Sequence, residues 1–195
     1  MNDIRKLGSH EHQLIGDVIG DSFSDDPINT WIFGTRECIS EYYALVAKKL
    51  YLSEGHGDIS IEENGGSLWL PPGKSKQIPL YRSLDIAKSM ITHNGIKSLV
   101  RGLAVDSALA KVKPKEPHFY LLSIGVRPNH QGKGIGGELM NAGLQRVDHA
   151  CMPAYLESSK AINIPFYQRF GFEVTNELLP TKDSPPLWMM WREAR

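Results

Sequence analysis

The chain is poor in cysteine, carries no net charge and has no long apolar run. Cys38 and Cys151 are its only two cysteines, too few for a disulfide framework, so we expect two reduced thiols in a cytoplasmic protein. Lys plus Arg and Asp plus Glu both number 22, so no overall charge attracts nucleic acid. Met1–Lys6 lacks the apolar core of a signal peptide, and no apolar segment is long enough to cross a bilayer.

Repeats and metal-ligand patterns are also missing. The seven histidines show no spacing typical of a zinc site, so we predict no metal. We find no internal repeat and no low-complexity segment. A length of 195 residues is enough to bury a proper core and fits one domain over 1–195.

Glycine, in contrast, is concentrated at one informative place. The apolar segment Phe119–Val126 is followed by a glycine-rich loop, Gln131–Gly137, and then by the pattern of an amphipathic helix. The first turn of a helix has unpaired N–H groups and a positive dipole end. Glycines let a bulky anion approach those N–H groups closely. The segment therefore predicts a pyrophosphate-binding loop.

Two common phosphate loops do not fit this segment. A Walker A loop needs a Ser or Thr after its lysine to hold magnesium, but Lys133 is followed by Gly134. A dinucleotide-binding loop has its first glycine directly after the strand, but Arg127–His130 intervene here. The remaining pattern is Gln131-x-x-Gly134-x-Gly136.

A second motif follows at a fixed distance. Tyr155-Leu-Glu-Ser-Ser159 indicates a short buried strand, and Asn163–Phe172 indicates a short helix closed by Gly171. The two motifs in this order resemble the GCN5-related N-acetyltransferase (GNAT) superfamily, strongly over residues 117–175 and in outline elsewhere. The second motif is most similar to the branch that contains puromycin N-acetyltransferase.

The resemblance implies an acyltransferase that moves an acetyl group from acetyl-CoA to a primary amine of a small molecule by direct attack. It also implies that one set of residues contacts the coenzyme. These residues are Ile124, Gly125, Val126, Gln131, Gly132, Lys133, Gly134, Ile135, Gly136, Gly137, Asn163, Phe166 and Tyr167.

Catalytic roles follow from the same resemblance. Tyr167 is the expected general acid for the leaving thiolate, and the backbone N–H of Val126 is the expected oxyanion donor beside a bulge in the central strand. The glutamate that serves as base in histone acetyltransferases of the superfamily corresponds to Tyr120 here. We name Glu157 as the first substitute, with His118 and Tyr120 as further candidates.

The expected fold is an α/β (α+β) GNAT fold. It has a mixed sheet of about six to seven strands with helices on both faces, and a helical insert over 74–115 between the third and fourth strands. The insert holds nine Lys or Arg against two Asp, which indicates a solvated face or, alternatively, a basic wall near the substrate. The strands expected along the whole chain are at 3–7, 59–61, 67–70, 119–126, 154–158, 172–175 and 187–191. The expected helices are at 10–23, 37–53, 78–92, 96–110, after 134 and near 163–170, of which those at 78–92 and 96–110 make up the insert.

Two other functions stay open at this point. A coenzyme-binding module could keep the fold without catalysis, but the intact Tyr167 favours an enzyme. A protein lysine or N-terminal acetyltransferase needs an open peptide groove, which the insert would tend to narrow. The sequence leaves the oligomeric state as monomer or homodimer.

Overall fold

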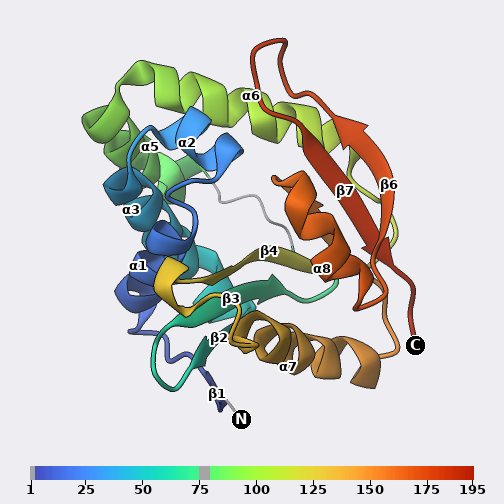
Figure 1. The fold of residues 1–195 in the computed structure, drawn as a ribbon. Helices are drawn as coiled ribbons and strands as arrows, with labels where there is room; N and C mark the ends of the chain where they lie inside the picture. Colours follow the sequence, from blue (N-terminus) through green and yellow to red (C-terminus); the bar gives the residue numbers. More distant parts are fainter. Residues whose placement is uncertain (1–2, 75–79) are drawn as a thin grey trace.

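A computed structural model describes residues 3–74 and 80–195 of the chain. Its centre is a seven-stranded sheet in the order β1-β2-β3-β4-β5-β7-β6 (Figure 1). Neighbouring strands are antiparallel except β4 and β5, which run parallel, so the sheet is mixed as predicted. The strands are β1 Ile4–Lys6, β2 His56–Ser60, β3 Gly65–Leu70, β4 Phe119–Val126, β5 Ala154–Ser158, β6 Glu173–Leu178 and β7 Leu187–Arg192.

Helices cover both faces of this sheet (Figure 1). On one face lie α1 His12–Ser22, α2 Pro27–Phe33 and α3 Arg36–Val46, which continues through a π-helical turn, η1 Ala47–Tyr51, into α4 Leu52–Glu54. On the other face lie α7 Ile135–His149 and α8 Ile164–Gln168. The predicted insert is present between β3 and β4 as α5 Leu80–Asn94 and α6 Ile96–Val112. Short 3-10 turns, η2 Pro128–His130 and η3 Ala161–Asn163, precede α7 and α8.

Alternation along the strands divides the buried residues into two cores. On β5, Tyr155 joins the core beneath α1 and α3, whereas Ala154 and Leu156 join the core beneath α7. Successive side chains of a strand point to opposite faces, so Glu157 lies on the same face as Tyr155. The sheet thus assigns Glu157 to the side that carries α1, α3 and the insert.

The strands β4 and β5 separate after a short parallel contact. They are paired only from Phe119 with Ala154 to Leu121 with Leu156. The register of β4 against β3 shifts at this level, since Trp69 pairs with Leu121 and Leu68 with Ser123. Leu122 is therefore the extra residue of a bulge, which bends the strand. Beyond it the two strands leave an opening in the middle of the sheet.

Two segments outside the expected helices and strands are regular. Residues 27–33 form α2, because Asp26 caps the helix by accepting from the Asn29 N–H and Pro27 occupies its first turn. The strand β2 begins at His56, three residues before the strand expected at 59–61, and pairs with β3. The side-chain pattern of β2 is a weak strand signal, but pairing with β3 supplies hydrogen-bond partners for its backbone.

Other expected elements are confirmed within small shifts of their ends. The strands β4 and β5 have the predicted limits. The helix predicted over 78–92 is α5, although residues 78 and 79 lie outside the described residues. In the described part of the chain, none of the helices combines the length and apolar character needed to span a membrane.

Packing between α7 and β3 provides a test of the fold. A Cβ added at Gly143 would lie 2.5 Å from Trp69 Cε2, and the indole is rigid and buried. We expect Gly143→Ala to lower the free energy of unfolding by ~1–3 kcal/mol, the usual cost of overpacking, measured by denaturant titration. Gly137→Ala on the same helix is the matched control, because its Cβ would meet only Phe170 at 3.9 Å. Equal stabilities of the two variants would contradict the tight packing of α7 on Trp69.

Candidate active site

A cavity of about 1920 Å³ passes through the opening between β4 and β5. At one end it is lined by the glycine-rich loop and α8, and at the other by α2, α3 and the insert helices. Its position connects the two faces of the sheet. A ligand can therefore reach from the loop on one side to the helices on the other.

The loop end has the geometry of an anion site. Gly134 is the N-cap of α7 with φ +87, and Gly132 has φ +76, a backbone region that favours glycine. No heavy atom lies within 4 Å of a Cβ built on either residue. The first N–H groups of a 15-residue helix are thus open to a pyrophosphate.

The end of β4 presents main-chain groups to the opening. The Arg127 N–H donates to the Asn64 carbonyl at 2.8 Å. Because N–H directions alternate along an antiparallel ladder, the Val126 N–H points away from β3 and toward the opening. The side chain of Gln131 donates through Nε2 to the Val126 carbonyl at 3.0 Å, which ties the loop to the strand. The bulge itself lies at Leu122, four residues before Val126.

The structure brings nearly all predicted coenzyme residues to this cavity. Lys133 alone is absent from the described lining. His130 and Arg169 also line the cavity, and Arg169 lies over the Phe166 ring at 5.6 Å. The residues that line it are Ile124, Gly125, Val126, Gln131, Gly132, Gly134, Ile135, Gly136, Gly137, Asn163, Phe166 and Tyr167.

Tyr167 lines the cavity from α8. It is 8% exposed and packs against Phe166 and Phe172. Burial, and to a lesser extent the charge of Asp26, raises the pKa of its phenol above the ordinary value. The hydroxyl is therefore protonated at neutral pH, and a carboxylate lies near it across the opening.

Glu157 is hydrogen-bonded to another tyrosine of the site, Tyr120. The Tyr120 hydroxyl donates to Glu157 Oε2 at 2.6 Å. Burial and then the charge of Glu157 raise the pKa values of both Tyr120 and Tyr155, so these phenols are donors and not bases. His118 Nδ1 lies 2.6 Å from the Glu116 carbonyl, and burial lowers the pKa of its imidazole. Of the three candidates, Glu157 and Tyr120 line the cavity and His118 is absent from its described lining.

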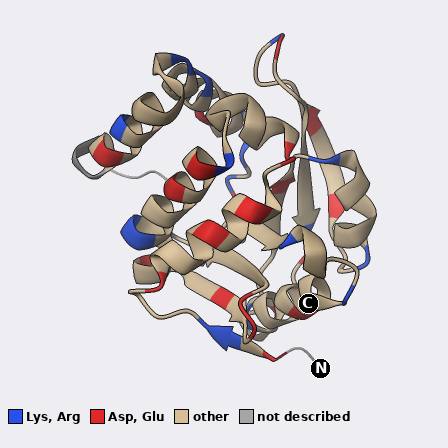
Figure 2. Ribbon diagram, turned by 60° about the vertical axis from the view of Figure 1, so that its left-hand side comes forward, with Lys and Arg blue, Asp and Glu red and all other residues tan. Residues whose placement is uncertain are grey.

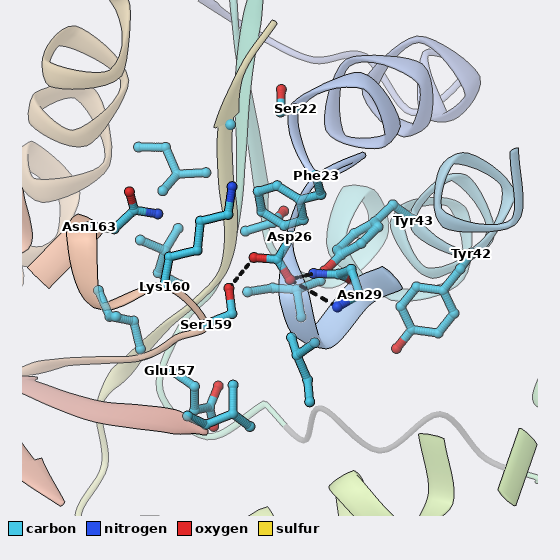
Figure 3. A pocket seen from close by; sticks show the side chains of 18 of the residues that line it. Ser22, Phe23, Asp26, Asn29, Tyr42, Tyr43, Glu157, Ser159, Lys160 and Asn163 are labelled. Carbon is cyan, nitrogen blue, oxygen red and sulfur yellow. Dashed lines mark hydrogen bonds between the residues drawn. The ribbon is translucent and has the colours of Figure 1, made fainter. Parts of the chain in front are cut away.

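Sequence reasoning missed Asp26, whose carboxylate is the centre of a buried network (Figure 3). Asp26 is 2% exposed, and its Oδ1 accepts from the Asn29 backbone N–H at 2.9 Å and the Asn29 Nδ2 at 2.7 Å. Its Oδ2 accepts from the Ser159 hydroxyl, and the Tyr43 hydroxyl donates to Asn29 Oδ1 at 3.2 Å. An Asp before Pro is an N-cap signal, but only the fold shows that this cap faces a cavity.

In the described part of the insert, charges of both signs lie near the cavity. The Arg101 guanidinium stacks 4.4 Å from the Trp31 ring centroid and donates to the Trp31 carbonyl, while Asp106 and Lys113 both line the cavity. In the view of Figure 2 both signs occur across the molecule. Over residues 3–74 and 80–195, no group of three or more His, Cys, Asp or Glu is placed to hold a metal ion.

Comparison with known proteins agrees with this geometry. Residues 99–172 match the family model described as the acetyltransferase (GNAT) family. An uncharacterized N-acetyltransferase of Schizosaccharomyces pombe is 27% identical over 97% of this chain and 82% of its own length.

Solved structures share the whole fold. A histone acetyltransferase HPA2 and related acetyltransferase from Corynebacterium glutamicum has a TM-score of 0.73 at 22% identity, covering 98% of this chain and 96% of its own. Arylalkylamine N-acetyltransferase 2 from Aedes aegypti has a TM-score of 0.66 at 14% identity, covering 99% of both chains. An N-acetyltransferase from Thermoplasma acidophilum, solved with coenzyme A, has a TM-score of 0.54 at 14% identity, covering 98% of both chains. These likenesses show that the chain has the GNAT fold.

The loop geometry predicts how the coenzyme binds. Gly134→Asp would add a negative charge beside the pyrophosphate, so we expect acetyl-CoA affinity to fall at least ~10-fold, measured by calorimetry. Gly134→Asn is the matched control, because its side chain has the same shape without the charge and both residues tolerate the left-handed conformation. An unchanged affinity in a folded Gly134→Asp protein would contradict the site.

Proposed function

We propose that the protein acetylates a primary amine of a small molecule by direct attack of the amine on acetyl-CoA. The observation that carries this proposal is the single cavity that joins the glycine-rich loop to an acceptor side lined by tyrosines and carboxylates. The insert helices α5 and α6 line this acceptor side, which favours a small substrate over an extended peptide. An arylalkylamine acetyltransferase with the same fold is in line with such a substrate.

The residues present supply each step of the transfer. A neutral amine nitrogen attacks the thioester carbon, forming a C–N bond, and the Val126 N–H stabilises the oxyanion. The amine gives one proton to a carboxylate. The C–S bond then breaks, and the Tyr167 hydroxyl gives its proton to the thiolate. Solvent then returns a proton to Tyr167 and takes the amine proton from the carboxylic acid, which restores both groups. Amine and thioester thus become amide and thiol with no net change in protons.

Two carboxylates are candidates for the base. Glu157 is held by Tyr120 on the acceptor face. Asp26 and Tyr167 both line the cavity, and the charge of Asp26 contributes to raising the pKa of Tyr167. We favour Asp26, with Ser159 and Asn29 fixing its carboxylate, and we assign Glu157 to binding the acceptor ammonium group before it loses its proton.

The finer assignments rest on the sequence. The stretch Leu156–Ser159 with Asn163–Tyr167 supports the branch that contains puromycin N-acetyltransferase. Two free thiols, Cys38 and Cys151, are in keeping with work in the cytoplasm. Asn163, in the cavity lining one turn before Tyr167, would hold the pantetheine arm through its amide.

Removing the Tyr167 hydroxyl tests the acid. Tyr167→Phe keeps the ring and its packing, so acetyl-CoA affinity should change little, whereas the single-turnover rate should fall by ~10²-fold or more because the lost interaction forms only as charge develops on sulfur. Rapid-quench measurement of the first turnover checks this independently of product release. A first turnover at the wild-type rate would leave Tyr167 as a packing residue.

Two isosteric variants distinguish the carboxylates. Asp26→Asn keeps an acceptor for the Asn29 N–H, so α2 should stay capped while the base is lost. We expect kcat/KM to fall ~10²–10⁴-fold with little change in amine KM. Glu157→Gln should mainly raise the amine KM and leave kcat nearly unchanged. The opposite pattern in the two variants would exchange their roles.

A further inference from the structure

We propose that the acceptor side ends in an apolar pocket, so that the preferred acceptors are primary amines with a long apolar tail. This proposal rests on the proposed function and names the class of amine that the site takes. The amino group would lie beside Asp26, and the tail would lie between α2 and the insert helices α5 and α6. These three helices pack against each other on one side of the molecule (Figure 1).

Each of the three helices contributes one pair of buried apolar side chains to the cavity wall. The two members of a pair are one turn apart, so they lie on the same face of their helix. All of them are between 4% and 8% exposed and belong to the core beneath α1 and α3, which makes the wall a fixed apolar surface. The pairs are Ile28 and Ile32 on α2, Ile86 and Met90 on α5, and Val105 and Leu109 on α6.

The polar residues that the insert adds to the described lining lie toward the solvent. Asp106 and Ser107 are exposed, and Ser83 and Lys113 are partly exposed, whereas the buried lining residues of the insert are all apolar. Ser83, Asp106 and Lys113 also interact with other groups of the chain. An apolar wall does not compensate for burying a charge or an unpaired polar group. The interior of the pocket therefore favours a hydrocarbon tail over a second charged group.

The helix α2 leads from the candidate base to this pocket. Asp26 is its N-cap, and Ile32 is in its last turn. With a rise of about 1.5 Å per residue, Ile32 lies ~9 Å further along the helix axis than Asp26. This end of α2 is fixed to the insert, because Arg101 donates to the Trp31 carbonyl at 2.6 Å and Asn94 donates to the Ile32 carbonyl at 3.3 Å. A ligand with its amine at Asp26 therefore has a path along α2 for a tail of several methylene groups.

The size of the cavity also favours a long tail. Its volume of about 1920 Å³ exceeds the ~300–1,000 Å³ of an ordinary ligand site, so it leaves room beyond the pantetheine arm and the reacting amino group. Moving one methylene group from water to an apolar wall strengthens binding by up to ~4-fold. A short amine leaves the pocket unfilled and gains nothing from this wall.

The experiment measures how the rate depends on chain length. Free-thiol release from acetyl-CoA is followed with the 1-aminoalkanes of three to eight carbons. In the wild-type enzyme kcat/KM should rise by ~2–4-fold per added methylene group until the pocket is full.

Two isosteric variants on α6 locate the effect. Val105→Thr keeps the shape of the side chain and adds a hydroxyl to the pocket wall, so kcat/KM for 1-aminooctane should fall at least ~3-fold while that for 1-aminopropane stays unchanged. Val100→Thr is the matched control, because Val100 is on the same helix, is 59% exposed and lies outside the described lining. It should behave as the wild-type enzyme with both amines.

A third variant tests the size of the pocket. Ala87 lies in the lining on α5, one turn before Met90, and is partly exposed. Ala87→Leu should fill part of the pocket, so the best chain length should become shorter. A wild-type rate that is independent of chain length, or an equal loss for short and long amines in Val105→Thr, would overturn the proposal.

A binding measurement separates the pocket from the reaction. If no amine releases thiol, the proposed function fails, and calorimetry of 1-aminooctane and 1-aminopropane with the coenzyme A complex decides on the pocket. Tighter binding of 1-aminooctane that Val105→Thr weakens supports the pocket. Equal binding of the two amines, or binding of neither, overturns it.

Discussion

The separation of β4 from β5 after Leu121 is the constraint on which the rest of the structure depends. The bulge at Leu122 bends β4. Beyond Leu121 and Leu156 the two strands are no longer paired, which leaves an opening in the sheet. Through this opening the Val126 N–H is available to a ligand. It also lets α2 and α8, which lie on opposite faces of the sheet, place Asp26 and Tyr167 in the lining of one cavity. A continuous ladder would give a stronger sheet but no path between coenzyme and acceptor.

Asp26 shows how one residue can serve both folding and chemistry. Its Oδ1 caps α2 through Asn29, and its Oδ2 accepts from Ser159 on the segment after β5. These bonds compensate for burying a carboxylate, and they fix its position in the cavity. Asn29 in turn accepts from Tyr43 on α3, so the rigid core supports the Asp26 carboxylate. The position of the candidate base is thereby coupled to the packing of three separate elements.

The coenzyme side could be predicted from local sequence signals. The acceptor side could not, because it is formed by contacts between residues far apart in the sequence. The limits of β4 and β5, the loop at Gln131–Gly137 and the short helix at Tyr167 follow from patterns within a few residues of each other. Asp26 carried only a capping signal, since its cavity is formed by segments more than a hundred residues away. The charges of the insert could not be placed from composition either, because Arg101 packs on Trp31 while Asp106 lines the cavity. Composition shows how many charged residues a helix carries, but only the packing of the helix shows which of them lie toward the cavity.

The two ends of the cavity differ in how much of the chain must be folded to build them. The loop, the end of β4 and the start of α7 form one continuous run, so the coenzyme end depends mainly on short-range structure. The acceptor end needs α2, α3, α6 and β5 in register at once, which involves contacts between very distant residues. Local opening of the insert would therefore abolish recognition of the amine while the loop kept its shape. In such a partly opened molecule the thioester would still be held but would be exposed to water. The ratio of acetyl transfer to hydrolysis would therefore depend on the stability of the acceptor end of the cavity.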